Sequence, residues 1–375
     1  MNLARFRATS ALTRPTPRAY VVGHRKPLQR RVTAVPATIR DVAAAAGVSV
    51  ATVSRVTTDG GYPVGAQTRA RVLAAIEELN YRPNALAGGL HQKNSRLIGV
   101  IAPDMSNPYY PEVTRGIEDV ANEHGYQVLL CSTDRDPGKA RSYIDALLKK
   151  RVAGLAIIGG GNEVSLEHRD VASYGASAVY IGRPSSRFST VRAENTRAAV
   201  EMTEHLISLG HRTIAFIAGN KDSSATTARQ RGWHRAMTAH GLAAGPALAE
   251  SGGYTEKGGY DAASALMRRE EKPTAVFAAN DRMAIGAMAA LADMGLRIPA
   301  DVAVVGFDDI PMSAYVRPAL TSVSVSARKM GYEAMRLLLR DGAPDARPKH
   351  VRVKTHLVIR DSCGGSNQPA THQVI

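Results

Sequence analysis

Residues 38–56 read TIRDVAAAAGVSVATVSRV and carry the signals of two short helices joined by a tight turn. Thr38, followed three residues later by Asp41, predicts a helix start in which hydroxyl and carboxylate each satisfy the other residue's backbone N–H. Gly47 suits the left-handed turn that ends such a helix. Ser49 suits the cap of a second helix. The spacing predicts a helix-turn-helix.

The second predicted helix, SVATVSRV at residues 49–56, has a buried and an outward face. Val48 and Val53 are expected to pack behind it, against a first helix in which the small Ala43 permits close crossing. Four positions are then left facing outward: Val50, Ala51, Ser54 and Arg55. A second helix held in this way is what a helix-turn-helix places in a major groove, although ordinary helix packing gives the same short pattern.

A third helix, AQTRARVLAAIEELNY at residues 66–81, has Val72, Ile76 and Leu79 on one face at helical spacing and is expected to support the first two. Residues 37–81 are therefore predicted to form an all-α DNA-binding domain. The segment RPNALAGGLHQKN, residues 82–94, has weak helix potential and is predicted to be a hinge.

The basic charge lies mostly at the start of the chain. The net charge is +15, of which residues 1–93 contribute +10. Such a concentration predicts a polyanionic partner rather than a merely soluble surface. Residues 1–36 hold eight basic residues, no acidic one and several prolines, and are predicted to form a disordered basic arm. A transit-like leader, a start codon assigned too far upstream and extra phosphate contacts all remain open for this arm.

Residues 95–361 are predicted to form a two-lobed α/β domain, and residues 362–375 a flexible polar tail. Short apolar runs such as LIGVIA, GLAIIG, TIAFIA and VAVVGF alternate with helical stretches, as in parallel sheets covered on both faces. A ligand crevice is expected at the carboxyl ends of the strands. Cys131 lies in an apolar run and Cys363 in the tail, so neither a disulfide nor a zinc site is expected, and a reducing cytoplasm fits. No apolar stretch approaches the length of a membrane span.

The motifs of common enzymes are missing from the sequence. It has no phosphate-binding loop with its lysine, no nucleophile elbow and no metal-ligand spacing. Asp308 and Asp309 are adjacent, so their side chains are expected to point apart and to make a poor acid–base pair. We therefore predict a binding protein with no catalytic residues, cofactor or metal. A solute receptor of periplasmic binding type is the alternative, but it would need an export signal and has no use for residues 38–90.

Several separated motifs in the same order make the chain resemble the LacI/GalR family of repressors. They are TIRDVAAAAGVSVATVSRV, TRARVLAAIEELNYRPNALAGGL, LIGVIAPDMSNPYY, AANDRMAIGA, VAVVGFDDI and RPALTSV, and together they span roughly residues 37–361. The resemblance implies an N-terminal all-α helix-turn-helix headpiece plus an α/β two-lobed periplasmic-binding-protein-like domain. It also implies a nucleoid-associated cytoplasmic repressor that binds a near-palindromic operator as a homodimer and responds to a small-molecule effector.

By this resemblance, Val50 and Ala51 select bases and Arg55 reads a guanine edge, which a guanidinium can do with two hydrogen bonds. Ser49, Thr52 and the first-turn backbone would hold phosphates. The full set of implied DNA-binding residues is Thr38, Ser49, Val50, Ala51, Thr52, Ser54, Arg55, Asn84, Ala87 and Leu90.

The segment NALAGGL, residues 84–90, matches the family's hinge helix, in which Leu90 would wedge into the minor groove. The sequence departs from the family at Gly88 and Gly89, each of which costs about 1 kcal/mol relative to alanine in a helix. A plain flexible linker is the alternative.

The resemblance also implies which residues line the effector cleft: Asn107, Tyr109, Tyr110, Arg229, Tyr254, Asn280, Phe307 and Asp308. Carboxylate, amide and guanidinium groups bind sugar hydroxyls, and aromatic faces suit a pyranose or a purine. Core packing is the alternative for the aromatic residues and a purely structural role for Asp308. Gly182 and Val325 replace ligand-binding residues of better-known members, so the expected effector is a sugar or sugar phosphate, with a purine nucleobase second.

Overall fold

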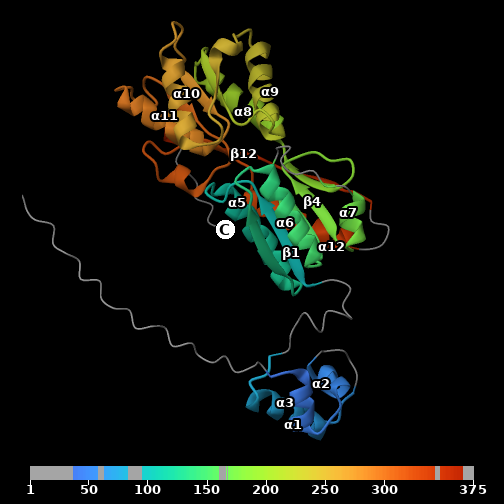
Figure 1. The fold of residues 1–375 in the computed structure, drawn as a ribbon. Coiled ribbons are helices and arrows are strands. Elements are labelled where there is room, and N and C mark those ends of the chain that lie inside the picture. The colour runs from blue at the N-terminus through green and yellow to red at the C-terminus, as the bar shows by residue number, and fades with distance from the viewer. Residues whose placement is uncertain are drawn as a thin grey trace, which may run out of the picture. The chain divides into compact units, whose positions relative to one another are not determined.

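The computed structural model describes residues 37–57, 63–82, 95–159, 166, 168–342 and 347–365. The chain divides into two compact units, Met1–Gly88 and Gly89–Ile375 (Figure 1). The described part of the first is helical, without strands, and the second has two α/β lobes, so the predicted fold class is confirmed. The predicted basic arm and nearly all of the predicted hinge, with Asn84, Ala87 and Leu90, lie outside the described residues.

The described part of the first unit is a bundle of α1 (Ile39–Ala46), α2 (Val50–Thr57) and α3 (Ala66–Glu78). At the start of α1 the backbone N–H of Thr38 donates to Asp41 Oδ2 over 2.7 Å, and the N–H of Asp41 donates to Thr38 Oγ1 over 3.4 Å. Gly47 ends α1 with φ of +62°. Each helix contributes one fully buried valine to the core, namely Val42, Val53 and Val72.

The first lobe of the second unit is built on a six-stranded, wholly parallel sheet of order β11-β5-β4-β3-β1-β2. Its strands are β1 (Leu97–Ala102), β2 (Gln127–Ser132), β3 (Gly154–Ile158), β4 (Ser177–Ile181), β5 (Ser189–Ala193) and β11 (His350–Val353). One face packs on α5 (Tyr109–Glu123) and α12 (Ala327–Asp341). The other face packs on α6 (Pro137–Lys149) and α7 (His168–Ser173).

The second lobe has a four-stranded parallel sheet of order β7-β6-β8-β9. Its strands are β6 (Ile214–Ala218), β7 (Ala249–Ser251), β8 (Ala275–Ala278) and β9 (Ala303–Val305). Four helices pack around it: α8 (Asn195–Ser208), α9 (Ser224–Ala239), α10 (Glu256–Met267) and α11 (Asp281–Asp293). An antiparallel pair, β10 (Ser322–Ser324) and β12 (His356–Val358), completes the lobe.

The chain passes between the lobes between β5 and α8, between β10 and α12, and between β11 and β12. Each crossing begins at the carboxyl end of a strand, namely β5, β10 or β11. A ligand crevice is expected at this position in a doubly wound fold.

The predicted boundary of a flexible tail at residue 362 is wrong by a few residues. Ser362 and Cys363 are buried, and Ser362 Oγ donates to the carbonyl of Val304. Cys363 packs in the core of the second lobe. The backbone N–H of Ser362 also donates to the carbonyl of Ala319, which ties this segment to the lobe. Residues 366–375 of the predicted tail lie outside the described part of the chain.

Within the described residues, no helix is long and apolar enough to cross a membrane.

Candidate functional site

The outward face of α2 has the composition predicted for it. Val53 and Val56 are buried, whereas the predicted contact residues Val50, Ala51, Ser54 and Arg55 are all exposed. Val50 is 41% exposed, which leaves its methyl groups available to a partner. The predicted orientation of the helix is confirmed, and the DNA contacts of these residues stay predictions.

Ser49 and Thr52, the two residues predicted to hold phosphates, lie at the start of α2, and the predicted DNA-binding residue Thr38 lies at the start of α1. Thr38 caps α1, and Ser49 Oγ accepts from the backbone N–H of Thr52 over 3.1 Å at the start of α2. A helix start carries a partial positive charge and unpaired N–H groups, which suit a phosphate oxygen. Both helix starts therefore offer donors where a DNA backbone would be held.

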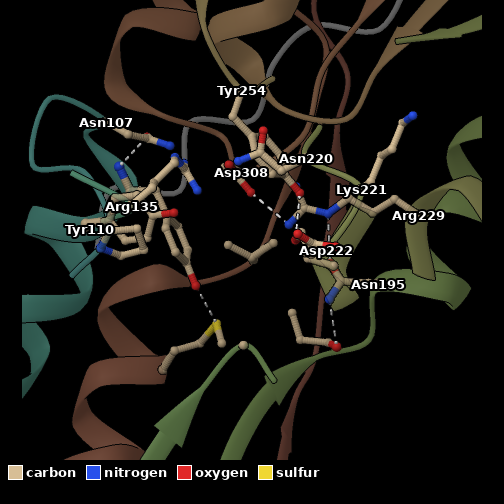
Figure 2. Close-up of a pocket in the computed structure, with 18 of the residues that line it drawn as sticks. Asn107, Tyr110, Arg135, Asn195, Asn220, Lys221, Asp222, Arg229, Tyr254 and Asp308 are labelled. Atoms are coloured by element: carbon tan, nitrogen blue, oxygen red, sulfur yellow. Dashed lines mark hydrogen bonds and ion pairs between the residues drawn. The ribbon is translucent and has the colours of Figure 1, made fainter. Parts of the chain in front are cut away.

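A cavity of about 660 Å³ lies between the lobes of the second unit (Figure 2). This is the size range of small-molecule sites. Six of the predicted effector residues line it: Asn107, Tyr109, Tyr110, Arg229, Tyr254 and Asp308. The two positions at which the sequence departs from the family, Gly182 and Val325, line it as well.

A buried ion pair forms the polar centre of this cavity. Arg229 Nη2 lies 3.0 Å from Asp308 Oδ1, and both side chains are 7% exposed. The guanidinium also donates to Asn195 Oδ1 over 2.9 Å and to the carbonyl of Ala279 over 2.5 Å. Its carbon lies 3.7 Å from the centre of the Phe307 ring. With so many contacts, the Arg229 side chain is held in one place in the cavity wall.

Burial raises the pKa of Asp308 to about 6, while the neighbouring Arg229 guanidinium acts in the opposite direction. Behind it, burial raises the pKa of Asp281 to about 7, and the charge of Asp308 adds to this rise. Asp281 accepts from the hydroxyls of Ser313 and Ser322 and from the backbone N–H of Ile310. Asp281 thereby anchors the loop that carries Asp308.

The aromatic residues form two opposite walls. Tyr109 and Tyr110, at the start of α5, meet edge to face with their ring centres 5.2 Å apart. On the other lobe, the Tyr254 hydroxyl hydrogen-bonds with Thr226 over 2.6 Å and with Ser223 over 3.1 Å. A planar or pyranose ring between these walls would meet an aromatic surface from each lobe.

Gly219 makes room for Tyr254, and this gives a testable prediction. A Cβ added at Gly219 would lie 2.2 Å from the Tyr254 ring. We expect Gly219→Ala to cost about 1–3 kcal/mol of unfolding free energy in urea titrations, since the ring must leave its hydrogen-bonded position. Gly245→Ala is the control because nothing lies within 4 Å of its added Cβ. If Tyr254→Ala fails to reduce the cost of Gly219→Ala, the ring is not its cause.

Two predicted effector residues lie outside the cavity wall. Asn280 is 1% exposed, and its Oδ1 accepts from the N–H of Met283 as the cap of α11. Phe307 is fully buried and lies beneath the Arg229 guanidinium. Both support the site from behind, although Asn280 Nδ2 finds no acceptor among the described residues.

Seven further polar residues of the wall were not predicted from the sequence: Arg135, Asn195, Asn220, Lys221, Asp222, Ser223 and Ser251. Asn220 to Asp222 begin two residues after the end of β6, and Arg135 lies three residues after the end of β2, so their place after strand ends was the available signal. Arg135 approaches the Tyr254 ring across the cavity, with its guanidinium carbon 5.6 Å from the ring centre.

A second contact bridges the two lobes. Arg282, at the start of α11, pairs with Asp104 of the first lobe over 3.0 Å and with Glu256 of its own lobe over 2.6 Å. It also donates to Ser106 Oγ over 3.1 Å. The arginine is only 11% exposed, so screening by solvent is limited. These contacts stabilise the lobe arrangement seen in this structure.

The adjacent carboxylates Asp308 and Asp309 point to different partners, as expected. Asp308 pairs with Arg229 and Asp309 with Arg360, over 3.0 and 2.7 Å. Such a pair does not provide two carboxylates facing one substrate. In the described part of the chain, no group of three or more His, Cys, Asp or Glu side chains is arranged to hold a metal ion.

Comparison with known proteins identifies both units. Residues 38–84 match the model for bacterial regulatory proteins of the lacI family, and residues 203–363 match a periplasmic binding protein-like domain. Catabolite control protein A of Priestia megaterium is 38% identical over 305 residues, which cover 80% of this chain and 91% of that protein. The transcriptional repressor PurR of Haemophilus influenzae (strain PittEE) is 34% identical over 81% of this chain and 90% of its own length.

Solved structures of transcriptional regulators are similar to this chain as well. The Lac repressor dimer bound to operator and the anti-inducer ONPF matches with a TM-score of 0.76 and 30% identity, over 88% of this chain and 99% of that one. A complex of the transcriptional regulator CelR with cellobiose matches with a TM-score of 0.66 and 31% identity, over 87% and 99%. With the matching domains in the same order and identity above 30% over most of both chains, this chain belongs to the LacI family of bacterial regulatory proteins.

Proposed function

We propose that this LacI-family regulator is a repressor whose operator binding is controlled by a small molecule in the cavity between its lobes. The observation that carries the proposal is the cavity wall, to which both lobes contribute and which has an arginine–carboxylate pair at its centre. A ligand that contacts both lobes binds one arrangement of them better than another, and can therefore shift the balance between the two.

The operator is proposed to be a near-palindrome bound by a homodimer, with one α2 in each of two successive major grooves. A two-fold protein calls for a two-fold site, because each half-site must present the same base edges to the same helix. The Lac repressor structure, a dimer on operator, supports this assembly. Since operator DNA lies in the bacterial cytoplasm, we propose that the protein works at the nucleoid. We also propose that it has no catalytic activity.

The effector is proposed to be a sugar or a sugar derivative. The wall combines amides, a carboxylate, a guanidinium and tyrosine rings, which together bind hydroxyl groups and the apolar face of a sugar. Two family structures with sugars support the class: CelR holds cellobiose, and a regulator from Enterococcus faecium at 28% identity holds ribose.

One experiment tests the repressor and the effector together. The full chain is used to select sites from random DNA duplexes, and the selected site is then titrated by gel shift with and without a panel of sugars and purine bases. We expect a near-palindrome and at least one sugar that changes its affinity. Failure to select any DNA at low salt would favour the solute-receptor alternative, and a response to purines alone would refute the sugar class.

A further inference from the structure

A second cavity, of about 630 Å³, adjoins the effector cavity and shares Gly182, Ala193 and Asn195 with it. Its remaining wall is dominated by arginines. The charged side chains that line it are Arg192, Arg197, Arg231, Arg352 and Glu194. We refer to it as the arginine cavity.

The single carboxylate in this wall does not neutralise the arginines. Glu194 pairs with Arg197 over 2.6 Å, and Arg197 also pairs with Glu201 over 2.5 Å. Among the described residues, no carboxylate forms an ion pair with Arg192, Arg231 or Arg352. The arginine cavity therefore keeps an excess of positive charge.

Two of these arginines are cross-strand neighbours. Parallel pairing of β5 with β11 places Arg192 directly beside Arg352. The preceding pair on the same face, Thr190 and His350, is close enough for a side-chain hydrogen bond of 3.0 Å. Like charges at directly opposed positions destabilise a sheet. In addition, Arg192 Nε is buried and finds no acceptor in the described part of the chain. An anion between the two guanidiniums would remove both costs.

The start of α8 adds donors to the same wall. Glu194, Asn195 and Thr196 line the cavity, and the Glu194 side chain makes no capping hydrogen bond. The first backbone N–H groups of this 14-residue helix thus have no side-chain cap. Unpaired N–H groups at a helix start and guanidinium forks are both suited to a phosphate.

We propose that the arginine cavity binds a phosphate group, either free inorganic phosphate or the phosphate ester of a small metabolite. The inference goes beyond the proposed function, because the wall is separate from the effector wall except for the three shared residues. Arg192 and Arg352 belong to the first lobe and Arg231 to the second, so a bound phosphate contacts both lobes. It therefore biases their arrangement as an effector does.

The test titrates sodium phosphate into the full-length protein without DNA, at an ionic strength held constant with sodium chloride, and measures heat and thermal unfolding. The wild type should bind phosphate saturably. Arg192→Gln combined with Arg352→Gln should weaken the dissociation constant at least about tenfold, since two charge-assisted contacts are lost. The control, Arg141→Gln on the exposed face of α6, should bind like the wild type.

Further variants separate loss of the site from loss of the fold. Without phosphate, the double glutamine variant should unfold at the same temperature as the wild type or higher, because the like-charge pair is gone. Arg192→Lys with Arg352→Lys keeps the charge and should bind with intermediate affinity. The proposal is overturned if the wild type shows no saturable binding, or if the double glutamine variant binds phosphate as tightly as the wild type.

A last arm identifies the source of the phosphate. A hexose 6-phosphate that binds more tightly than inorganic phosphate and competes with it points to a phosphorylated metabolite, whereas equal affinities point to free phosphate. Operator selection in phosphate-free buffer is independent of this site. A failure of phosphate binding is therefore distinguishable from a failure of the proposed repressor function.

Discussion

Replacing Arg229 with methionine is expected to destabilise the second unit by about 3–5 kcal/mol at pH 8, because it leaves the Asp308 carboxylate buried without its partner. The arginine side chain is only 7% exposed, and it hydrogen-bonds to Asn195 and Ala279 in addition to its ion pair with Asp308. Urea titrations of unfolding measure the loss. The same variant should no longer respond to the effector that shifts operator binding in the wild type.

The effect of Arg229→Met should depend on pH in a defined direction. Burial raises the pKa of Asp308 from 3.8 to about 6, so the folded protein holds this proton more tightly than the unfolded chain. The stability that this group contributes is therefore full below pH 3.8 and is lost as the pH rises through about 6. Without the guanidinium the pKa rises further, so the loss should be larger at pH 8 than at pH 5.

A double-mutant cycle with Asp308→Asn isolates the ion pair. The combined variant carries neither charge and should be more stable than the sum of the two single losses predicts. If the two losses of unfolding free energy are additive at pH 8, or if the loss for Arg229→Met does not change with pH, the Arg229–Asp308 pair does not stabilise the folded protein.

The parts of the fold that were predictable from the sequence are those that local signals specify. The capping residues Thr38 and Asp41 and the glycine at position 47 act within a few residues, so they mark their helix wherever it packs. The long apolar runs of β1, β3 and β6 are buried on both faces, so their composition alone indicates central strands.

Strands β5, β7 and β11 were missed because they depend on distant partners. STVRA at β5 and HVRV at β11 mix polar and apolar residues, and the two pair although they lie about 160 residues apart in the chain. The short β7 is one of the two edge strands of its sheet. Its three residues, AES, include two polar ones, so composition does not reveal it.

The residues of the cavity wall also include some that the sequence could predict and some that it could not. Asn107, Tyr109 and Asp308 follow strand ends, so resemblance and position were enough to place them. Arg135 reaches the wall only because the two lobes face each other, which no local pattern specifies. Phe307 is next to Asp308 in sequence, yet its side chain points back into the core, where it supports Arg229. The chain bends after β9 and Asp308 has φ of +105°, so the two neighbouring side chains point in different directions and proximity in sequence did not imply a shared wall.

Replacing Arg55 with alanine is expected to weaken operator binding by about 1–3 kcal/mol for each half-site, and to relax the base preference at the position it reads. Arg55 lies exposed in the last turn of α2, on the same face as Val50 and Ala51. Its guanidinium can donate two parallel hydrogen bonds to a guanine edge, and alanine can donate none. Selection from random duplexes, followed by titration of the wild-type site at two salt concentrations, measures both effects.

The control for Arg55 removes an equal charge from α3, which is predicted to support the other two helices and not to enter the groove. Arg69 is exposed on α3, the supporting helix, so Arg69→Ala should leave the base preference unchanged. Any effect of Arg69→Ala should be a uniform weakening on all sequences, because a charge that acts on phosphates carries no base information. Arg55→Ala should instead weaken the selected site far more than random DNA. If Arg55→Ala selects the same site as the wild type with the same affinity, α2 does not read bases through this residue.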